Sequence, residues 1–244
     1  MSPKSKVQSP KLPFVFVNMA MTADGKIATA NRAVHSFGSA RDLEHLYELR
    51  ATADAVLCGA RTVEVSGTIL GTGGAKFRQL RLQHGLAEYH LRVMVSGSGS
   101  LDPQAAIFKK KFSPVIVLTT RRASATKLAQ LRRLADEVKV FGETEGNFPS
   151  ALRWLRAKWG VKRLLCEGGG ELNDALFRAG LVDEINLTMC PKIFGGGTAP
   201  TIADGLGFQH LADAAKFELT SIKRGKAELF TVFTRRIKRH FASF

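Results

Sequence analysis

The chain has 244 residues, 45% of them hydrophobic and 23% charged, which is the composition of a folded globular protein and excludes disorder over most of its length. No stretch approaches the roughly 18 consecutive apolar residues of a membrane span, and the N-terminus lacks the apolar segment of a secretory signal, so we expect a cytoplasmic protein. The net charge of +15 raises nucleic acid as a partner, but aromatic residues do not alternate with the basic clusters, which favours a solvated basic surface.

The predicted elements follow a leader rich in Ser, Pro and Lys, which we expect to be disordered to about residue 11, before a single domain over 12–244. Apolar runs rich in β-formers predict strands over 14–21, 53–58, 91–95, 114–118, 138–141, 161–166, 184–190, 217–222 and 227–233. Periodic apolar positions predict helices over 39–50, 124–134, 148–158 and 171–179, the first with Ser39 as N-cap. This order predicts an α/β protein with a mostly parallel central sheet, flanking helices and antiparallel C-terminal strands.

Glycine-containing turns follow three of the predicted strands, at the carboxyl ends where such sheets bind ligands. In the turn at 59–63, backbone N–H groups, the Thr62 hydroxyl and the Arg61 cation could converge on an anion. In the turn at 167–170, three glycines before a helix would let a phosphate approach bare backbone, and a tight turn without a ligand is the alternative. The turn at 96–99 offers hydroxyls and free amides, and is otherwise a flexible loop.

Motifs of several other chemistries are missing from the sequence. There is no Gly-x-x-x-x-Gly-Lys-Ser/Thr phosphate loop and no Gly-x-Ser-x-Gly nucleophile turn. The three cysteines lie too far apart for a disulfide framework or a cysteine-based zinc site, and no other metal site is expected. We therefore expect a reaction whose reactive atom arrives with a cofactor, which the protein binds and orients.

Four segments in order, 18–28, 53–63, 165–172 and 191–200, resemble the motifs of the riboflavin-pathway pyrimidine reductases and together extend over nearly the whole chain. The resemblance implies a dihydrofolate-reductase-like fold, NADPH as cofactor, a homodimer, and reduction of the ribose of a phosphoribosylaminopyrimidine to a ribityl chain. The zinc deaminase motifs that bacterial relatives often carry are missing. A reductase alone is what remains, similar to the single-function enzymes of archaea and fungi, which Asn18 in the first segment also resembles.

The same resemblance implies roles for individual residues. Asp24 would lie at the ribose, where a carboxylate can orient ring opening, and Glu167 would face the substrate or nicotinamide, or else be a buried structural carboxylate. The substrate-binding candidates are Asn18, Thr22, Ser66 and Leu70. The cofactor-binding candidates are Gly59, Ala60, Arg61, Thr62, Val63, Ser96, Thr119, Thr120, Gly168, Gly169, Gly170 and Leu172. Contacts from Arg61, Ser96, Ser98 or Arg121 to a 2′-phosphate would favour NADPH over NADH.

The chain departs from the family pattern directly after Val63. Relatives usually have an acidic pair and a proline there, whereas this chain continues through 64–74 with only Leu70 in place. Because this segment helps to bind the sugar phosphate in relatives, a reductase of another small heterocyclic or carbonyl substrate is a second hypothesis. Arg78 and Arg81, in a predicted helix, could replace the lost phosphate contacts or form a solvated face. A nucleotide- or nucleic-acid-binding protein without catalysis is a third hypothesis, supported only by the positive charge.

Overall fold

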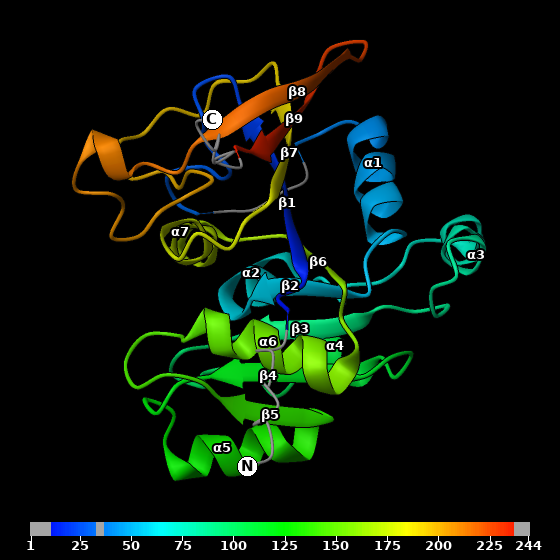
Figure 1. Ribbon diagram of the computed structural model, residues 1–244, viewed down its shortest axis with the longest axis vertical. Coiled ribbons are helices and arrows are strands. Elements are labelled where there is room, and N and C mark those ends of the chain that lie inside the picture. The colour runs from blue at the N-terminus through cyan, green and yellow to red at the C-terminus, as the bar shows by residue number, and fades with distance from the viewer. Residues whose placement is uncertain (1–10, 33–36, 237–244) are drawn as a thin grey trace, which may run out of the picture.

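The computed structural model describes residues 11–32 and 37–236, and its nine strands form one sheet in the order β5-β4-β3-β2-β6-β1-β7-β9-β8 (Figure 1). The strands are β1 (Phe14–Thr22), β2 (Ala55–Gly59), β3 (Leu91–Val95), β4 (Val115–Thr119), β5 (Glu137–Val140), β6 (Arg163–Cys166), β7 (Glu184–Cys190), β8 (Phe217–Arg224) and β9 (Leu229–Arg235). Strands β1 to β7 pair in parallel, whereas β9 pairs antiparallel with both β7 and β8. The predicted fold class is confirmed, and the predicted leader lies almost entirely outside the described residues.

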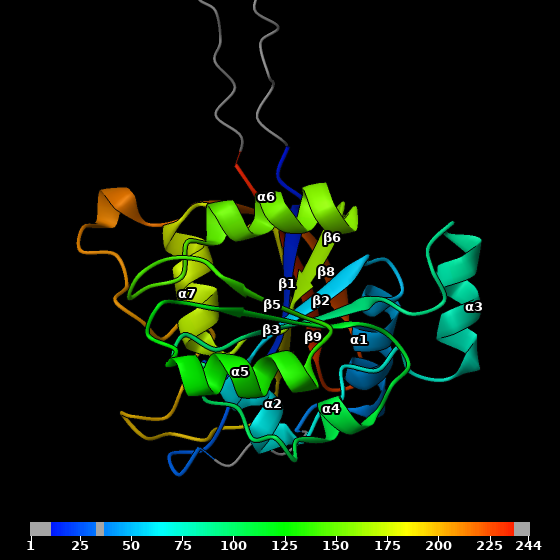
Figure 2. The same ribbon diagram turned by 90° about the horizontal axis from the view of Figure 1, so that it is seen from below.

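Helices cover both faces of the parallel part of the sheet, which explains why its strands are continuous apolar runs. The α-helices are α1 (Ala40–Arg50), α2 (Ala60–Ser66), α3 (Ala75–Gln83), α4 (Ala106–Lys109), α5 (Ala125–Leu134), α6 (Phe148–Trp159) and α7 (Gly170–Arg178). Figure 2 shows α6 and α7 on one side of the sheet and α2, α4 and α5 on the other, with α3 standing apart. Two buried apolar clusters correspond to these faces, one packed under α6 and α7 and one under α2, α4 and α5.

Capping residues explain where two helices begin, and the predicted N-cap role of Ser39 is confirmed. The Ser39 hydroxyl accepts hydrogen bonds from the N–H groups of Arg41 and Asp42 at the start of α1, and the Ser124 hydroxyl accepts one from Lys127 N at the start of α5. The short helices α2 and α4 were not predicted as helices, because seven and four residues are too few for an apolar period to emerge. None of the helices in the described ranges has the length and apolar character needed to span a membrane.

The antiparallel end of the sheet is more open than the parallel part. The β8–β9 hairpin continues the sheet beyond β7, and β8 is its edge strand, with Leu219 48% exposed and Ile222 60% exposed. Besides pairing with β7, this hairpin contacts the start of α1. The Glu228 carboxylate accepts hydrogen bonds from Ser39 N at 2.7 Å and from the Ser39 hydroxyl at 2.5 Å. The hairpin therefore fixes the start of the helix that borders the cleft described next.

Candidate active site

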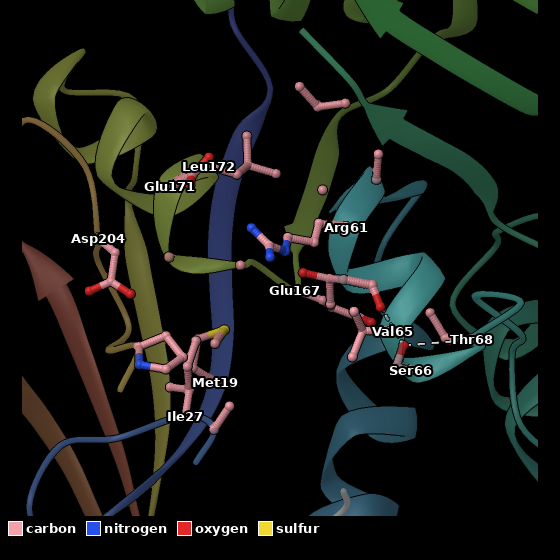
Figure 3. Close-up of a pocket in the computed structure, with 18 of the residues that line it drawn as sticks. Met19, Ile27, Arg61, Val65, Ser66, Thr68, Glu167, Glu171, Leu172 and Asp204 are labelled. Carbon is pink, nitrogen blue, oxygen red and sulfur yellow. Dashed lines mark hydrogen bonds between the residues drawn. The ribbon is translucent and has the colours of Figure 1, made fainter. Parts of the chain in front are cut away.

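A large cleft opens at the carboxyl ends of the parallel strands and has a volume of about 1210 Å³. Its lining comes from the ends of β1, β2 and β3, from the turns that follow β2 and β6, and from the helices α1, α2 and α7. Figure 3 shows Arg61 and Glu167 on one side of the cleft and Met19, Ile27 and Asp204 on the other, with Glu171 and Leu172 at the start of α7. This is the position at which open parallel sheets bind ligands.

The two glycine turns predicted to hold the cofactor meet beside this cleft. Gly59 N donates a hydrogen bond to Gly168 O at 2.7 Å, so the end of β2 and the turn after β6 are in direct contact. A Cβ atom on Gly59 would lie 3.5 Å from Gly168 O, and one on Gly169 would lie 3.1 Å from the Thr62 hydroxyl oxygen. The absence of side chains at these glycines is what permits the close approach.

Two helix N-termini border the same cleft. Gly59 is the N-cap of α2 and Gly169 is the N-cap of α7, and neither N-terminus receives a hydrogen bond from a capping side chain. Ala60, Arg61 and Thr62 of α2, and Gly170 and Leu172 of α7, line the cleft. Uncapped first-turn amides carry partial positive charge and lack partners, which suits them to phosphate oxygens. The residues present therefore fit the pyrophosphate of a dinucleotide.

The turn after β3 forms a further part of the wall. Ser96, Gly97 and Ser98 line the cleft. Thr119 and Thr120, predicted to contact the adenosine end, lie behind this turn instead: both are buried, and their hydroxyls donate hydrogen bonds to Gly97 O at 3.3 Å and 2.7 Å. Neither lines the cleft, so in this structure their hydroxyls support the turn that does. Arg121 forms an exposed ion pair with Glu143.

The floor of the cleft carries a buried ion pair between Glu167 and Arg50. Arg50 Nε and Nη2 each donate to one Glu167 carboxylate oxygen at 2.6 Å, and Arg50 Nη1 donates to Gly71 O at 2.5 Å. The two side chains are 6% and 11% exposed, and both residues line the cleft. Burial acts to lower the pKa of Arg50, but the Glu167 carboxylate, with smaller contributions from Tyr47 and Cys58, raises the pKa overall. Glu167 thus lines the cleft as a nearly buried, ion-paired carboxylate, and its contact with substrate or nicotinamide stays a prediction.

A polar group of side chains lies on the opposite, β1–α1 side. Asn18 lines the cleft, and its Oδ1 atom is buried without a hydrogen-bond partner among the described residues. Asp42 also lines the cleft; burial raises its pKa, the Thr188 hydroxyl opposes this, and the nearby Glu228 carboxylate adds to it. A buried acceptor without a partner is costly, and a bound ligand with an N–H or O–H donor would satisfy Asn18.

Asp24 and Thr22 lie beyond the cleft lining, at the turn that ends β1. The Thr22 hydroxyl donates to the Asp24 carboxylate at 2.5 Å, and Gly195 N and Phe194 N donate to it at 2.7 Å and 3.2 Å. The Thr22 contact is the largest cause that lowers the pKa of Asp24, and these backbone contacts add to it. The carboxylate therefore joins the β1 turn to the segment after β7, and its contact with substrate stays a prediction.

The segment that departs from the family pattern contributes unequally to the cleft. Ser66 and Thr68 line it, whereas Leu70 is buried in the core, as is Val63 just before the segment. Arg81, predicted either to grip phosphate or to be solvated, does neither: its guanidinium is buried and donates to Arg50 O at 2.7 Å and Ala53 O at 2.6 Å. Arg78 pairs with Glu88 instead of reaching the cleft.

His90 contacts the backbone of this segment at Leu70, and its burial makes the stability of the folded protein depend on pH. His90 Nε2 lies 2.9 Å from Leu70 O, and burial together with the Arg50 and Arg81 charges lowers the pKa of His90 from 6.5 to about 3. Below pH 6.5 the unfolded chain binds a proton on this side chain that the folded protein does not, so stability falls as the pH decreases. We expect His90→Gln to reduce the slope of unfolding free energy against pH by about 1.4 kcal/mol per pH unit between about pH 6 and pH 4. Urea unfolding at a series of pH values measures this slope; equal slopes in the two proteins would contradict the prediction.

The sequence predicted no role at the site for Arg50 or Asp42, although both lie on the predicted first helix. A usable signal was present, because Arg50 shares a helix face with Leu43, Leu46 and Tyr47. A cation on the buried face of an amphipathic helix needs a buried anion as partner.

Within residues 11–32 and 37–236, no group of three or more His, Cys, Asp or Glu side chains is arranged to hold a metal ion.

Comparisons with known proteins agree with this geometry. The family model described as RibD C-terminal domain matches residues 13–230. The 2,5-diamino-6-ribosylamino-4(3H)-pyrimidinone 5′-phosphate reductase of Archaeoglobus fulgidus is 34% identical over 206 residues, which are 84% of this chain and 93% of that protein. The reductase of the same name from Aquifex aeolicus is 29% identical over 219 residues, 88% of this chain and 93% of that protein.

Solved structures support the fold. A pyrimidine reductase-like protein from Corynebacterium diphtheriae superposes with a TM-score of 0.78 at 20% identity, covering 92% of each chain. A riboflavin biosynthesis reductase from Saccharomyces superposes with a TM-score of 0.67 at 13% identity, covering 92% of this chain and 90% of that one. With the match over residues 13–230, the predicted family is confirmed, and the chain belongs to the RibD C-terminal domain family.

Proposed function

We propose that this chain is an NADPH-dependent reductase of riboflavin biosynthesis, which reduces the ribose of a phosphoribosylaminopyrimidine to a ribityl chain. The observation that carries the proposal is the contact between the Gly59 and Gly168 turns, which places two uncapped helix N-termini together at the cleft. Membership of the pyrimidine reductase family supplies the reaction class. The proposal treats residues 12–244 as one reductase domain, because all nine strands belong to one sheet.

In the proposed complex, the first-turn amides of α2 and α7 bind the pyrophosphate, and the turn at 96–98 lies along the nucleotide. When bound, NADPH supplies a hydride to the anomeric carbon of the opened ribose. Arg61 lines the cleft and forms no ion pair among the described residues, so its guanidinium is the first candidate for the 2′-phosphate that distinguishes NADPH from NADH.

The chain's own residues then position the substrate and exclude water. Asn18 offers a buried acceptor to the pyrimidine or ribose, and Ser66 and Thr68 border the place where the sugar phosphate would lie. Glu167 keeps a fixed carboxylate at the floor through its ion pair. Asp24 fixes the turn that ends β1, and the proposal keeps it as the candidate that orients ring opening.

The experiment that tests this function is turnover of the purified protein with the diamino and the deaminated forms of the phosphoribosylaminopyrimidine, followed by NADPH absorbance and by product mass. Growth of a riboflavin-requiring strain that lacks its reductase is the matching test in cells. No turnover on either pyrimidine, together with oxidation of NADPH by another heterocycle, would favour the second hypothesis. The altered segment at 64–74 is the observation that keeps this alternative open.

The proposal includes a homodimer in the cytoplasm. Edge strand β8 exposes Leu219 and Ile222, and a second copy of the chain would remove these apolar side chains from water. The cysteines Cys58, Cys166 and Cys190 are buried free thiols, as expected in a reducing compartment. Light scattering after gel filtration should give twice the mass of one chain for the wild type, and Ile222→Lys should shift the protein toward monomer; a monomeric wild type would contradict the dimer.

A further inference from the structure

Arg50 brings together three segments that are far apart in the sequence. Its guanidinium lies at the end of α1, and its donors are divided between the Glu167 carboxylate, in the turn after β6, and the Gly71 carbonyl, in the segment after α2. The Tyr47 ring lies 5.5 Å from the guanidinium carbon, on the same helix. The turn after β6 contains glycines of the proposed cofactor site. The segment after α2 carries Thr68, which lies on the proposed substrate side of the cleft.

The geometry gives each contact a separate effect. The bidentate pair fixes both oxygens of Glu167, so the carboxylate cannot rotate away from the cleft. The single bond to Gly71 O fixes the backbone that follows Ser66 and Thr68. Because a buried charge left without its partner is strongly unfavourable, neither contact can be exchanged for water at low cost.

From this arrangement, which rests on the proposed function, we infer that Arg50 is a positioning residue with two roles: it holds Glu167 for turnover through the ion pair, and it holds the substrate-binding segment through Gly71. Arg50 does not itself need to touch the reacting atoms. The two roles affect different kinetic constants. The role through Glu167 affects kcat, whereas the role through Gly71 affects the KM for the pyrimidine.

The test is a double-mutant cycle with Arg50→Lys and Glu167→Gln, measured by steady-state kinetics. We expect each single variant to lower kcat about 100-fold, because loss of orientation at a reacting centre has effects of this size. In the Glu167→Gln background, Arg50→Lys should lower kcat by no more than about twofold further. Arg50→Lys should also raise the KM for the pyrimidine about tenfold in both backgrounds, by losing the hydrogen bond to Gly71 O.

Arg92→Lys is the matched control, because Arg92 is another buried arginine that donates to backbone oxygens, Ile107 O at 2.9 Å among them, but lies outside the cleft lining. A purely structural role for Arg50 would make the two lysine variants alike, with lower thermal stability and little change in kcat or KM. That result, or a loss of kcat from Arg50→Lys that is as large in the Glu167→Gln background as in the wild type, would overturn the inference.

Hydrogen exchange of the ligand-free protein tests the inference independently of turnover. Arg50→Lys should accelerate amide exchange at least about tenfold at 68–73 and at 168–170 together, whereas Arg92→Lys should accelerate neither segment. Unchanged exchange at both segments in Arg50→Lys would overturn the inference even if the wild type reduces the pyrimidine. A wild type that reduces neither pyrimidine would instead contradict the proposed function, and the exchange result would still decide the role of Arg50.

Discussion

In the variant Gly169→Val, NADPH binding should be lost while the fold remains. A Cβ atom on Gly169 would lie 3.1 Å from the Thr62 hydroxyl oxygen, and the two methyl groups of valine would extend into the space between the two helix N-termini. The φ angle of Gly169 is −69°, so valine meets no penalty for a left-handed backbone. Loss of two charge-assisted hydrogen bonds to the pyrophosphate should raise the dissociation constant for NADPH at least about 100-fold.

Fluorescence titration with NADPH measures this change, and circular dichroism with thermal unfolding shows that the variant is folded. Ala129→Val, on the exposed surface of α5, adds a branched side chain far from the cleft and serves as the control, with affinity expected to equal that of the wild type. Gly169→Ala should be intermediate, because a single Cβ requires the Thr62 side chain to move only slightly. Normal NADPH affinity in Gly169→Val would show that the cofactor binds elsewhere.

Glu167→Leu should produce the largest loss of stability at the site, because it leaves the Arg50 cation buried without its anion. Removal of one partner from a buried ion pair costs about 3–5 kcal/mol, and these side chains are only 6% and 11% exposed. Replacement of both partners, Arg50→Met with Glu167→Leu, should recover most of that loss while turnover stays low. The pair would then be required for function more than for the stability of the fold.

Urea unfolding at neutral pH measures the unfolding free energy of the single and the double variant. An unchanged m-value indicates that the unfolding transition exposes the same surface. Glu143→Leu breaks the Arg121–Glu143 pair, whose side chains are 72% and 76% exposed, and is the control. It should change the unfolding free energy by less than about 1 kcal/mol, as is usual for surface ion pairs. If the unfolding free energy of Glu167→Leu is no lower than that of Glu143→Leu, the prediction is contradicted, because Arg50 would then not be left as a buried cation without a partner.

The parts of this protein that could be predicted from sequence are those fixed by local patterns. Apolar runs identified the parallel strands because both faces of each strand are buried, and the glycine turns identified the places where backbone approaches backbone. Ser39 and Ser124 marked helix starts because capping needs only neighbouring amides. The order of four motifs identified the family.

The remainder depends on contacts between residues distant in the sequence. Arg50 and Glu167 are separated by 117 positions, and no local pattern indicates that they pair. Arg81 reads as a solvated helix residue until the fold places backbone carbonyls around it. Asp24 was expected at the substrate, but its carboxylate accepts hydrogen bonds from a segment about 170 residues later. Leu70 matched the family pattern in position, and the fold placed its side chain in the core.

The position of β1 in the sheet affects the order in which the protein can assemble during synthesis. Among the strands of this sheet, β1 is synthesised first, yet both of its neighbours, β6 and β7, are made much later. Strands β2 to β5 neighbour one another in space in the order of their synthesis, and can pair as they emerge. We therefore expect that, once residue 140 but not yet residue 163 has emerged, β2 to β5 form a four-stranded sheet while β1 is still unpaired. The ability to bind ligand would then be one of the last properties that the growing polypeptide acquires.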